Sequence, residues 1–158
     1  MASTPTVSAP SASTQSRSTR SESSTLPAIA APVALLGRFL FALIFLMSAP
    51  MDFVGKTIAF AASQGVPLAS ISVPLSGMIT LAGGFSILLG YHARIGARLI
   101  VLFLAVVTPM LHNFWAVADP MMHQMQFIMF MKNLSMLGGA LLISQVGAGP
   151  WSLDALRK

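Results

Sequence analysis

Two ionisable side chains lie inside long apolar segments, and chemistry can be assigned to them first. Arg38 lies in the apolar segment 32–49, and Lys132 lies in the segment 120–145. A charged group in lipid costs several kcal/mol unless it is paired or reaches water. Arg38 lies about six residues, roughly 9 Å, into its segment, so its side chain can extend to the headgroups. Lys132 lies about twelve residues, roughly 18 Å, into its own segment, and at that depth its ammonium group does not easily reach the headgroups.

A ligand site is the alternative to such an extension. The apolar segments contain no carboxylate, and the acids nearest to them, Asp52 among them, lie at their outer ends. Asp52 either reaches toward Lys132 or pairs with Lys56 at the i, i+4 spacing. A buried cation beside Asn133 and Gln126 suits a quinone carbonyl or an anionic group, because both need hydrogen-bond donors in a dry site. The candidate ligand-binding residues are therefore Lys132, Asn133, Arg38, Asp52 and His112.

Histidines and methionines gather near the outer ends of the last two apolar segments. His112 and His123 are only a short loop apart, and thioethers that suit copper(I) surround them: Met110, Met121, Met122, Met125 and Met129. The competing interpretation is an apolar helical stripe made of Met122, Met125, Met129 and Met136. We favour the stripe and expect no metal and no haem. His112 is expected to cap a helix or to hydrogen-bond near Asn113, and the absence of cysteine excludes iron–sulfur centres.

Composition determines the class of the fold. Hydrophobic residues make up 55% of the chain and charged residues 8%, whereas soluble domains carry roughly 25% charge. Four segments are long and apolar enough to cross a bilayer: 32–49, 74–91, 95–115 and 120–145. Asp119 and Pro120 fit the N-cap and first residue of the fourth helix. The middle of the longer connection 52–72 could form a short interfacial helix, ended by Gly65 and Pro67. The sequence predicts an all-α transmembrane four-helix bundle whose main partner is the lipid bilayer.

The two ends of the chain are predicted to be tails. Residues 1–28, rich in Ser and Thr, have nothing to bury and should be a disordered cytoplasmic tail, although an organellar transit peptide has a similar composition. Residues 29–146 form the membrane domain, and residues 147–158 form a short cytoplasmic tail. With both termini in the cytoplasm, six cations lie on that side and only Lys56 lies opposite. The scattered cations form no face for nucleic acid.

Small residues indicate where the helices approach one another. Residues at every fourth position of the second segment form one such stripe: Ser72, Ser76, Thr80 and Gly84. Ser135 and Gly139 have the same spacing in the fourth segment. We expect these two stripes to pack together.

Five segments carry a family resemblance that covers essentially everything after the tail: LGRFLFALIFLMSAPMD at 36–52, GVP at 65–67, LAGGFSILLGY at 81–91, HNFW at 112–115 and FMKNLSMLGGALL at 130–142. They resemble the DoxX family. The resemblance implies a four-helix bacterial inner-membrane protein, related to the DoxD subunit associated with thiosulfate:quinone oxidoreductase. HNFW and KNLSMLGG are its most specific parts.

The resulting hypothesis is an accessory subunit of a quinone-linked membrane oxidoreductase assembly, with quinone as the candidate cofactor. The chain has no phosphate loop, nucleophile elbow or paired carboxylates, so a non-catalytic subunit is favoured over a self-sufficient enzyme. One alternative is a structural or assembly protein that binds a partner helix through the stripe from Ser72 to Gly84. The other is a small-solute transporter, for which four short helices without an inverted repeat offer little.

Overall fold

The computed structural model describes residues 31–157 of the chain, so the predicted tail 1–28 lies outside the described residues. Four helices are long and apolar enough to cross a membrane: Ala31–Phe53, Ala69–Leu89, Ala93–Ala116 and Pro120–Val146. The described residues include no β-strand. The predicted all-α membrane bundle is therefore confirmed.

The first helix covers residues 31–48 and tightens into the 3₁₀ helix η1, Ala49–Phe53. Pro50 lies at this change, where a residue without an N–H donor is tolerated in a new first turn. The short helix α2, Gly55–Ser63, follows. Gly65, at φ +81, turns the chain away after it, as only glycine does without steric cost. The predicted short helix before Gly65 is confirmed.

Helix α3, Ala69–Leu89, begins five residues before the predicted start at Pro74, and that prediction was wrong. Pro74 lies in the second turn of the helix, where its missing N–H removes one hydrogen bond without breaking the helix. The Ser72 hydroxyl donates to the carbonyls of Pro67 and Leu68, at 3.0 and 3.2 Å, and so ties down the first turn.

Helix α4, Ala93–Leu111, ends four residues before the predicted end at Trp115. His112 leaves helical geometry, and the 3₁₀ helix η2, Phe114–Ala116, follows. The turn brings the Phe114 ring within 5.3 Å, between centroids, of the Phe127 and Phe130 rings of α5. Aromatic packing therefore replaces the last predicted turn of the helix.

Helix α5, Pro120–Val146, has nearly its predicted bounds. The Asp119 carboxylate accepts a hydrogen bond from the Met122 backbone N–H at 2.8 Å, so the predicted N-cap is confirmed. After α5 the chain folds back and forms the short helix α6, Leu153–Leu156, beside the turn between α3 and α4.

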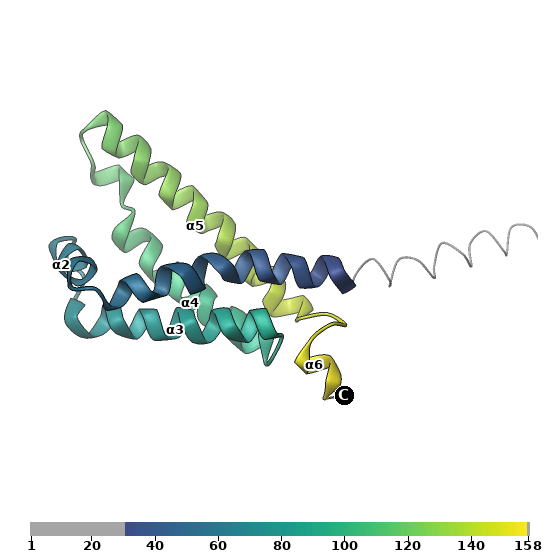
Figure 1. Ribbon diagram of the computed structural model, residues 1–158. Helices are drawn as coiled ribbons and strands as arrows, with labels where there is room; N and C mark the ends of the chain where they lie inside the picture. Colours follow the sequence, from purple (N-terminus) through teal and green to yellow (C-terminus); the bar gives the residue numbers. More distant parts are fainter. Residues whose placement is uncertain (1–30, 158) are drawn as a thin grey trace, which may run out of the picture.

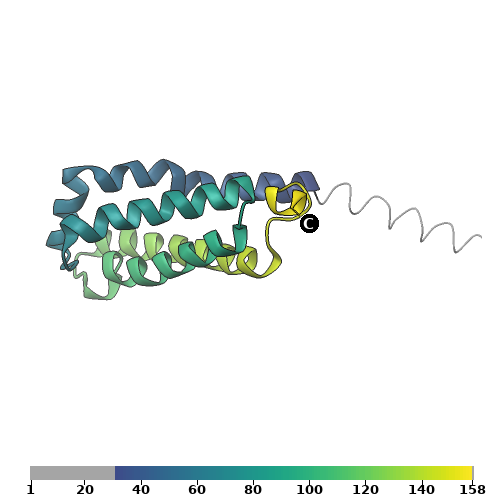
Figure 2. The same cartoon turned by 90° about the horizontal axis from the view of Figure 1, so that it is seen from below.

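The bundle has two arms that join at the end carrying α6. The first arm is residues 31–89, and the second arm is residues 93–146. The arms diverge toward the end that carries α2 (Figure 1), and seen from below the long helices run side by side (Figure 2). Where the arms join, a buried core forms from Ala42, Phe45, Ile87, Ala97, Ile100, Leu104 and Ala140.

Glycines set the closest approaches between the helices. A Cβ atom on Gly84 would lie 3.0 Å from a Leu46 methyl, and one on Gly139 would lie 2.9 Å from the Phe41 ring. The glycine of each predicted stripe therefore meets the first helix, and the two glycines do not meet each other as the predicted packing of the stripes requires. Of the other stripe residues, Ser72 and Ser76 are half-buried, Thr80 is buried and Ser135 is exposed.

Replacing Gly96 by Ala should loosen the joint between the arms. A Cβ atom there would lie 2.5 Å from the Ser86 Cβ and 3.0 Å from the Gly83 carbonyl oxygen. Such overpacking costs about 1–3 kcal/mol, which denaturant unfolding in mixed micelles would measure. Gly138→Ala is the matched control, because nothing lies within 4 Å of the added atom. Equal unfolding midpoints for Gly96→Ala and the wild type would contradict this packing.

Candidate functional site

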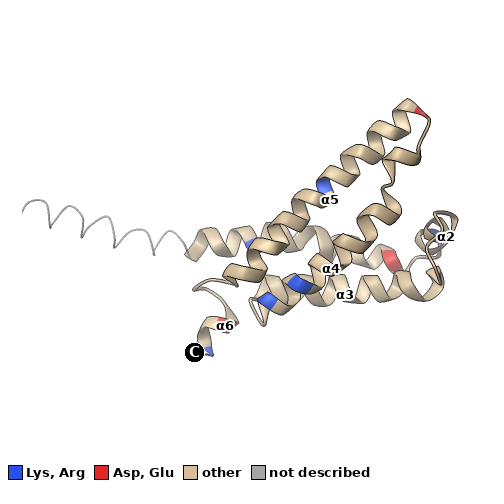
Figure 3. Ribbon diagram, turned by 180° about the vertical axis from the view of Figure 1, so that it is seen from behind, with Lys and Arg blue, Asp and Glu red and all other residues tan. Residues whose placement is uncertain are grey.

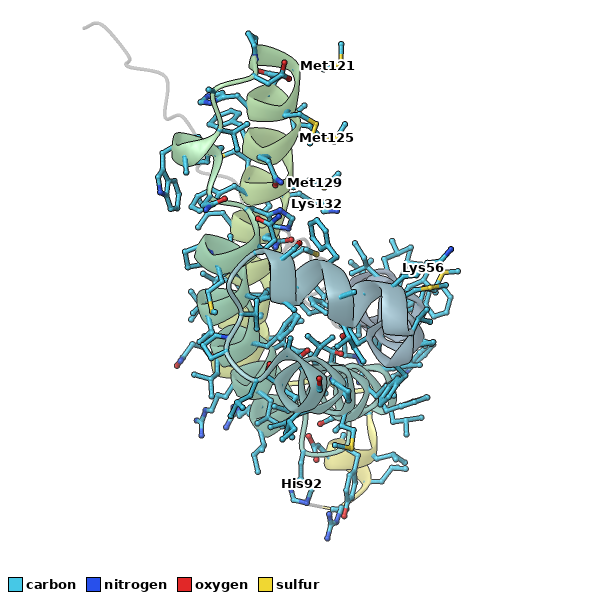
Figure 4. The ribbon with its side chains drawn as sticks, turned by 90° about the vertical axis from the view of Figure 1, so that its left-hand side faces the viewer. Lys56, His92, Met121, Met125, Met129 and Lys132 are labelled. Atoms are coloured by element: carbon cyan, nitrogen blue, oxygen red, sulfur yellow. The ribbon has the colours of Figure 1, made fainter. Side chains whose placement is uncertain are left out.

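The N-terminal half of α5 carries a mostly exposed face, which we call the methionine–lysine face: Met121, Met125, the half-buried Met129 and Lys132. Their spacing puts them on one side of the helix, and Figure 4 shows them along the side of α5 that overhangs the first arm. Met121 is 77% exposed and Met125 50%. Lys132 is also exposed, and no residue in 31–157 forms a hydrogen bond or ion pair with it.

The divergence of the arms explains why this face is uncovered. Gly139 of α5 packs against Phe41 of the first helix near the joined end. Farther out, α5 rises away from the first helix and α3 (Figure 1). The methionine–lysine face therefore lies beyond the contact between Gly139 and Phe41, on the side of α5 that points toward the first arm.

The predicted ligand-binding residues are not gathered in one place. Lys132 is exposed where a buried cation was expected, and Asn133 is buried at 7% exposure. Neighbouring residues of a helix point about 100° apart, so Lys132 and Asn133 do not share a site. Asp52 is half-buried in the first arm, where a Cβ atom on Gly77 would lie 2.9 Å from the Asp52 Cβ. Lys56 is exposed, and within the described part of the chain it forms no ion pair with Asp52.

His112 joins the two helices of the second arm. Its Nδ1 lies 2.8 Å from Oε1 of Gln126, a distance that suits a ring N–H donating to an amide oxygen. Gln126 is thus its side-chain partner, and His112 is also the C-cap residue of α4, as the capping prediction had it. The His123 ring lies 5.6 Å from the Phe114 ring, edge to face. Both histidines serve packing, and residues 31–157 hold no group of three His, Cys, Asp or Glu side chains that could bind a metal.

The segment after α5 is tied to the α3–α4 turn by Asp154. Its carboxylate accepts hydrogen bonds from the backbone N–H groups of His92, at 2.8 Å, and Ala93, at 3.1 Å. These groups open α4, and the preceding residues supply no side-chain cap for them. The Asp154 N–H also donates to the Gly90 carbonyl at 2.8 Å. A residue 62 positions away along the chain therefore caps α4.

Two arginines complete this C-terminal clasp, which we define as residues 147–157 together with the α3–α4 turn. The Arg157 guanidinium lies over the Tyr91 ring, 5.2 Å from its centroid. Its Nη1 is 3.2 Å from Nε2 of His92. Arg38, only 4% exposed, donates from Nη2 to the Trp151 carbonyl. Arg38 therefore links the first helix to the clasp, and its side chain extends toward the α6 end of the bundle to a carbonyl of the protein itself.

The contacts in this clasp favour the charged form of Asp154. Partial burial raises the pKa of Asp154, but the two backbone N–H groups and the nearby His92 and Arg157 lower it by more, so the pKa lies below its usual range. Sequence reasoning missed Asp154 and His92 altogether. The only local signal was Ser152, whose hydroxyl accepts from the Ala155 N–H at 3.2 Å and caps α6.

Comparison with known proteins identifies the family. The model of the SURF4 family matches residues 32–158, which is most of the chain. This chain belongs to the SURF4 family. The predicted DoxX membership is thereby corrected, because the matched motifs lie in segments that the SURF4 model covers. No solved structure matches the chain significantly.

Three curated proteins are similar to this SURF4-family chain. Inner membrane protein YqjF of Escherichia coli is 32% identical over 65% of the chain and 77% of its own length. Inner membrane protein YphA of the same organism is 30% identical over 79% and 91%. The ER-derived vesicles protein ERV29 of Saccharomyces cerevisiae is 28% identical over 51% of the chain and 26% of its own length. The SURF4-family chain is thus a multi-pass membrane protein with relatives in bacteria and yeast.

Acid should release the clasp of this SURF4-family protein. Folding lowers the pKa of Asp154. Its contribution to the stability of the clasp is therefore complete above the pKa of the unfolded chain, about 4, and is lost as the pH falls through the lower pKa of the folded protein. Asp154→Ala should cost the start of α4 about 1 kcal/mol, seen as roughly fivefold faster amide exchange at Ala93.

Asp119→Ala is the matched control, because it removes a carboxylate cap from α5 at the opposite end. It should leave the exchange at Ala93 unchanged. Equal exchange at Ala93 in the wild type and in Asp154→Ala, at neutral pH, would show that the clasp does not protect α4.

Proposed function

We propose that this SURF4-family protein is a non-catalytic membrane protein that binds a membrane-spanning segment of a partner protein between its two arms. The observation that carries the proposal is the exposed ammonium group of Lys132 near the middle of α5, which has no hydrogen-bond or ion-pair partner among residues 31–157. Lys132 lies about twelve residues, roughly 18 Å, from the start of the helix. A cation at such a depth is costly and usually marks a functional contact.

The charge of Lys132 specifies the chemistry of the partner. An acidic side chain in the partner segment would supply the missing acceptor in a medium of low dielectric constant. A second copy of this chain does not supply it. Asp52 and Asp119 lie at the α2 end of the arms, Asp154 is engaged in the clasp, and Glu22 precedes the apolar segments. The partner is therefore a different protein.

The methionines beside Lys132 suit such a partner. Methionine side chains are flexible and polarizable, and they repack against irregular apolar surfaces. A segment lying between the arms would contact Met125 and Met129 with its apolar residues and Lys132 with its acid. The alternative surface, the stripe from Ser72 to Gly84, is less suitable because Thr80 and Gly84 are buried against the protein itself.

The observations on which the quinone-linked redox hypothesis depended no longer support it. The quinone-linked hypothesis rested on the DoxX resemblance and on a buried pair of Lys132 and Asn133. The chain belongs to another family, and Lys132 is exposed. The names of the three relatives describe inner-membrane and vesicle proteins, which supports a membrane role.

We infer that the protein lies in an inner membrane and that both of its termini are in the cytoplasm. Within the described residues, Arg38, Arg94, Arg98 and Arg157 lie toward the end with α6, whereas Lys56 lies at the α2 end. Figure 3 shows this gathering of basic positions. The distribution supports the cytoplasmic placement of the α6 end by the positive-inside rule.

Photocrosslinking in native membranes tests the partner proposal. A benzoylphenylalanine placed at Met125 should give a discrete protein adduct, and Lys132→Met should reduce this adduct about tenfold, because the partner's acid then loses its cation in lipid. Lys132→Arg should retain it. Lys56→Met, which removes an exposed cation from the α2 end, is the control and should leave the adduct unchanged.

Unfolding in mixed micelles separates binding from folding. Lys132→Met should keep or raise the unfolding midpoint, since it removes a charge from an apolar helix face. An adduct of equal intensity in Lys132→Met, or crosslinks to lipid alone, would refute the proposal.

A further inference from the structure

A cleft of about 600 Å³ opens between the start of α4 and the segment that follows α5. Arg94 and Arg98, one turn apart on α4, form one wall. Gly147, Pro150, Ser152 and Asp154 are among the residues of the other wall. The cleft lies at the end of the bundle remote from the methionine–lysine face, so any function it has is separate from the proposed partner site.

The two arginines of this cleft have unused hydrogen-bond donors. Both side chains are exposed, and neither forms a hydrogen bond or ion pair with any residue in 31–157. A guanidinium group carries five N–H donors in a planar fork that matches the oxygens of a phosphate group. The cleft thus presents two such forks on one helix face.

The only acid in the lining does not neutralise them. The Asp154 carboxylate accepts hydrogen bonds from His92 and Ala93 at the start of α4. His92, which also lines the cleft, has its Nε2 near Arg157. The lining therefore keeps the positive character that Arg94 and Arg98 give it.

A glycine leaves room for the Arg94 side chain beside the segment after α5. Gly147 has φ +85, and a Cβ atom there would lie 3.2 Å from Nε of Arg94. The absence of a side chain at Gly147 lets Arg94 lie close against the segment after α5. The guanidinium therefore lies at the wall of the cleft.

The depth of the cleft matches the headgroup region of a bilayer. It lies where α3 and α5 end and α4 begins. Tyr91 and Trp151, at the same end, are 45% and 58% exposed, as aromatic residues at a membrane interface are. Basic pockets at the ends of transmembrane helices bind anionic lipid headgroups.

We propose that this cleft binds the phosphate group of an anionic phospholipid, held by Arg94 and Arg98. The acyl chains would lie along the exposed apolar surface beside α4, on which Ile95 is 54% exposed and Leu102 62%. A soluble phosphate ester shares the recognised chemistry, but it lacks chains for that surface.

Native mass spectrometry of the full chain in neutral detergent tests the proposal, with dioctanoyl-phosphatidylglycerol as the probe. Phosphatidylglycerol should bind more tightly than dioctanoyl-phosphatidylcholine, whose choline offsets the phosphate charge. The double variant Arg94→Gln/Arg98→Gln should weaken phosphatidylglycerol binding about tenfold, because two charge-assisted contacts are lost. The control Lys56→Gln removes one cation from the α2 end and should change binding less than twofold.

Several outcomes would overturn the lipid site. One is equal binding of phosphatidylglycerol by the double variant and the wild type, and another is an equal loss in Lys56→Gln. Displacement of the lipid by excess inorganic phosphate would assign the cleft to a soluble phosphate. If the double variant does not fold, Arg98→Gln alone should still weaken binding. Lys132→Met should leave lipid binding unchanged, so this proposal and the partner proposal can fail separately.

Discussion

Close backbone approach at glycines is the constraint on which the rest of this structure depends. In lipid, apolar side chains gain little by leaving the acyl chains for one another, so helices associate where small residues let them touch. Gly83 and Gly96 bring α3 to α4, and Gly84 and Gly139 receive side chains of the first helix. The contacts of Gly83, Gly96 and Gly139 join the two arms toward the α6 end, and the contact of Gly84 holds α3 to the first helix within the first arm.

Toward the α2 end, each arm is held together by contacts of its own. Gly77 packs against Asp52 and Phe53 within the first arm. The rings around Phe114 and the hydrogen bond from His112 to Gln126 join α4 to α5 within the second. These contacts lie within an arm, so the arms are free to diverge and the methionine–lysine face stays uncovered.

The charged side chains of the joined end interact mainly with backbone groups and not in ion pairs. Arg38 donates to a carbonyl after α5, and Asp154 accepts from the N–H groups that open α4. Both satisfy polar backbone atoms at helix ends, because such atoms cost free energy near lipid when they lack a hydrogen-bond partner. Lys132, Arg94 and Arg98 lie outside this arrangement, and their exposed side chains are therefore available to a partner or a lipid.

Composition and hydropathy by themselves determined the class of the protein, the number of spans and most of their bounds, because only a helix satisfies its own backbone in lipid. Local signals also located the Asp119 cap and the short helix before Gly65. DoxX membership was wrong, because apolar helices with small residues look alike across membrane families and only comparison along the whole chain separated them.

Tertiary structure alone decided where the charges lie. The exposure of Lys132 depends on the angle between the arms, and no local pattern encodes that angle. The cap that Asp154 places on α4 joins residues 62 positions apart, so neither segment signals it alone. Arg38 was expected to extend to the headgroups because it lies only about six residues into its segment, and only the folded C-terminal clasp supplies the Trp151 carbonyl to which it donates.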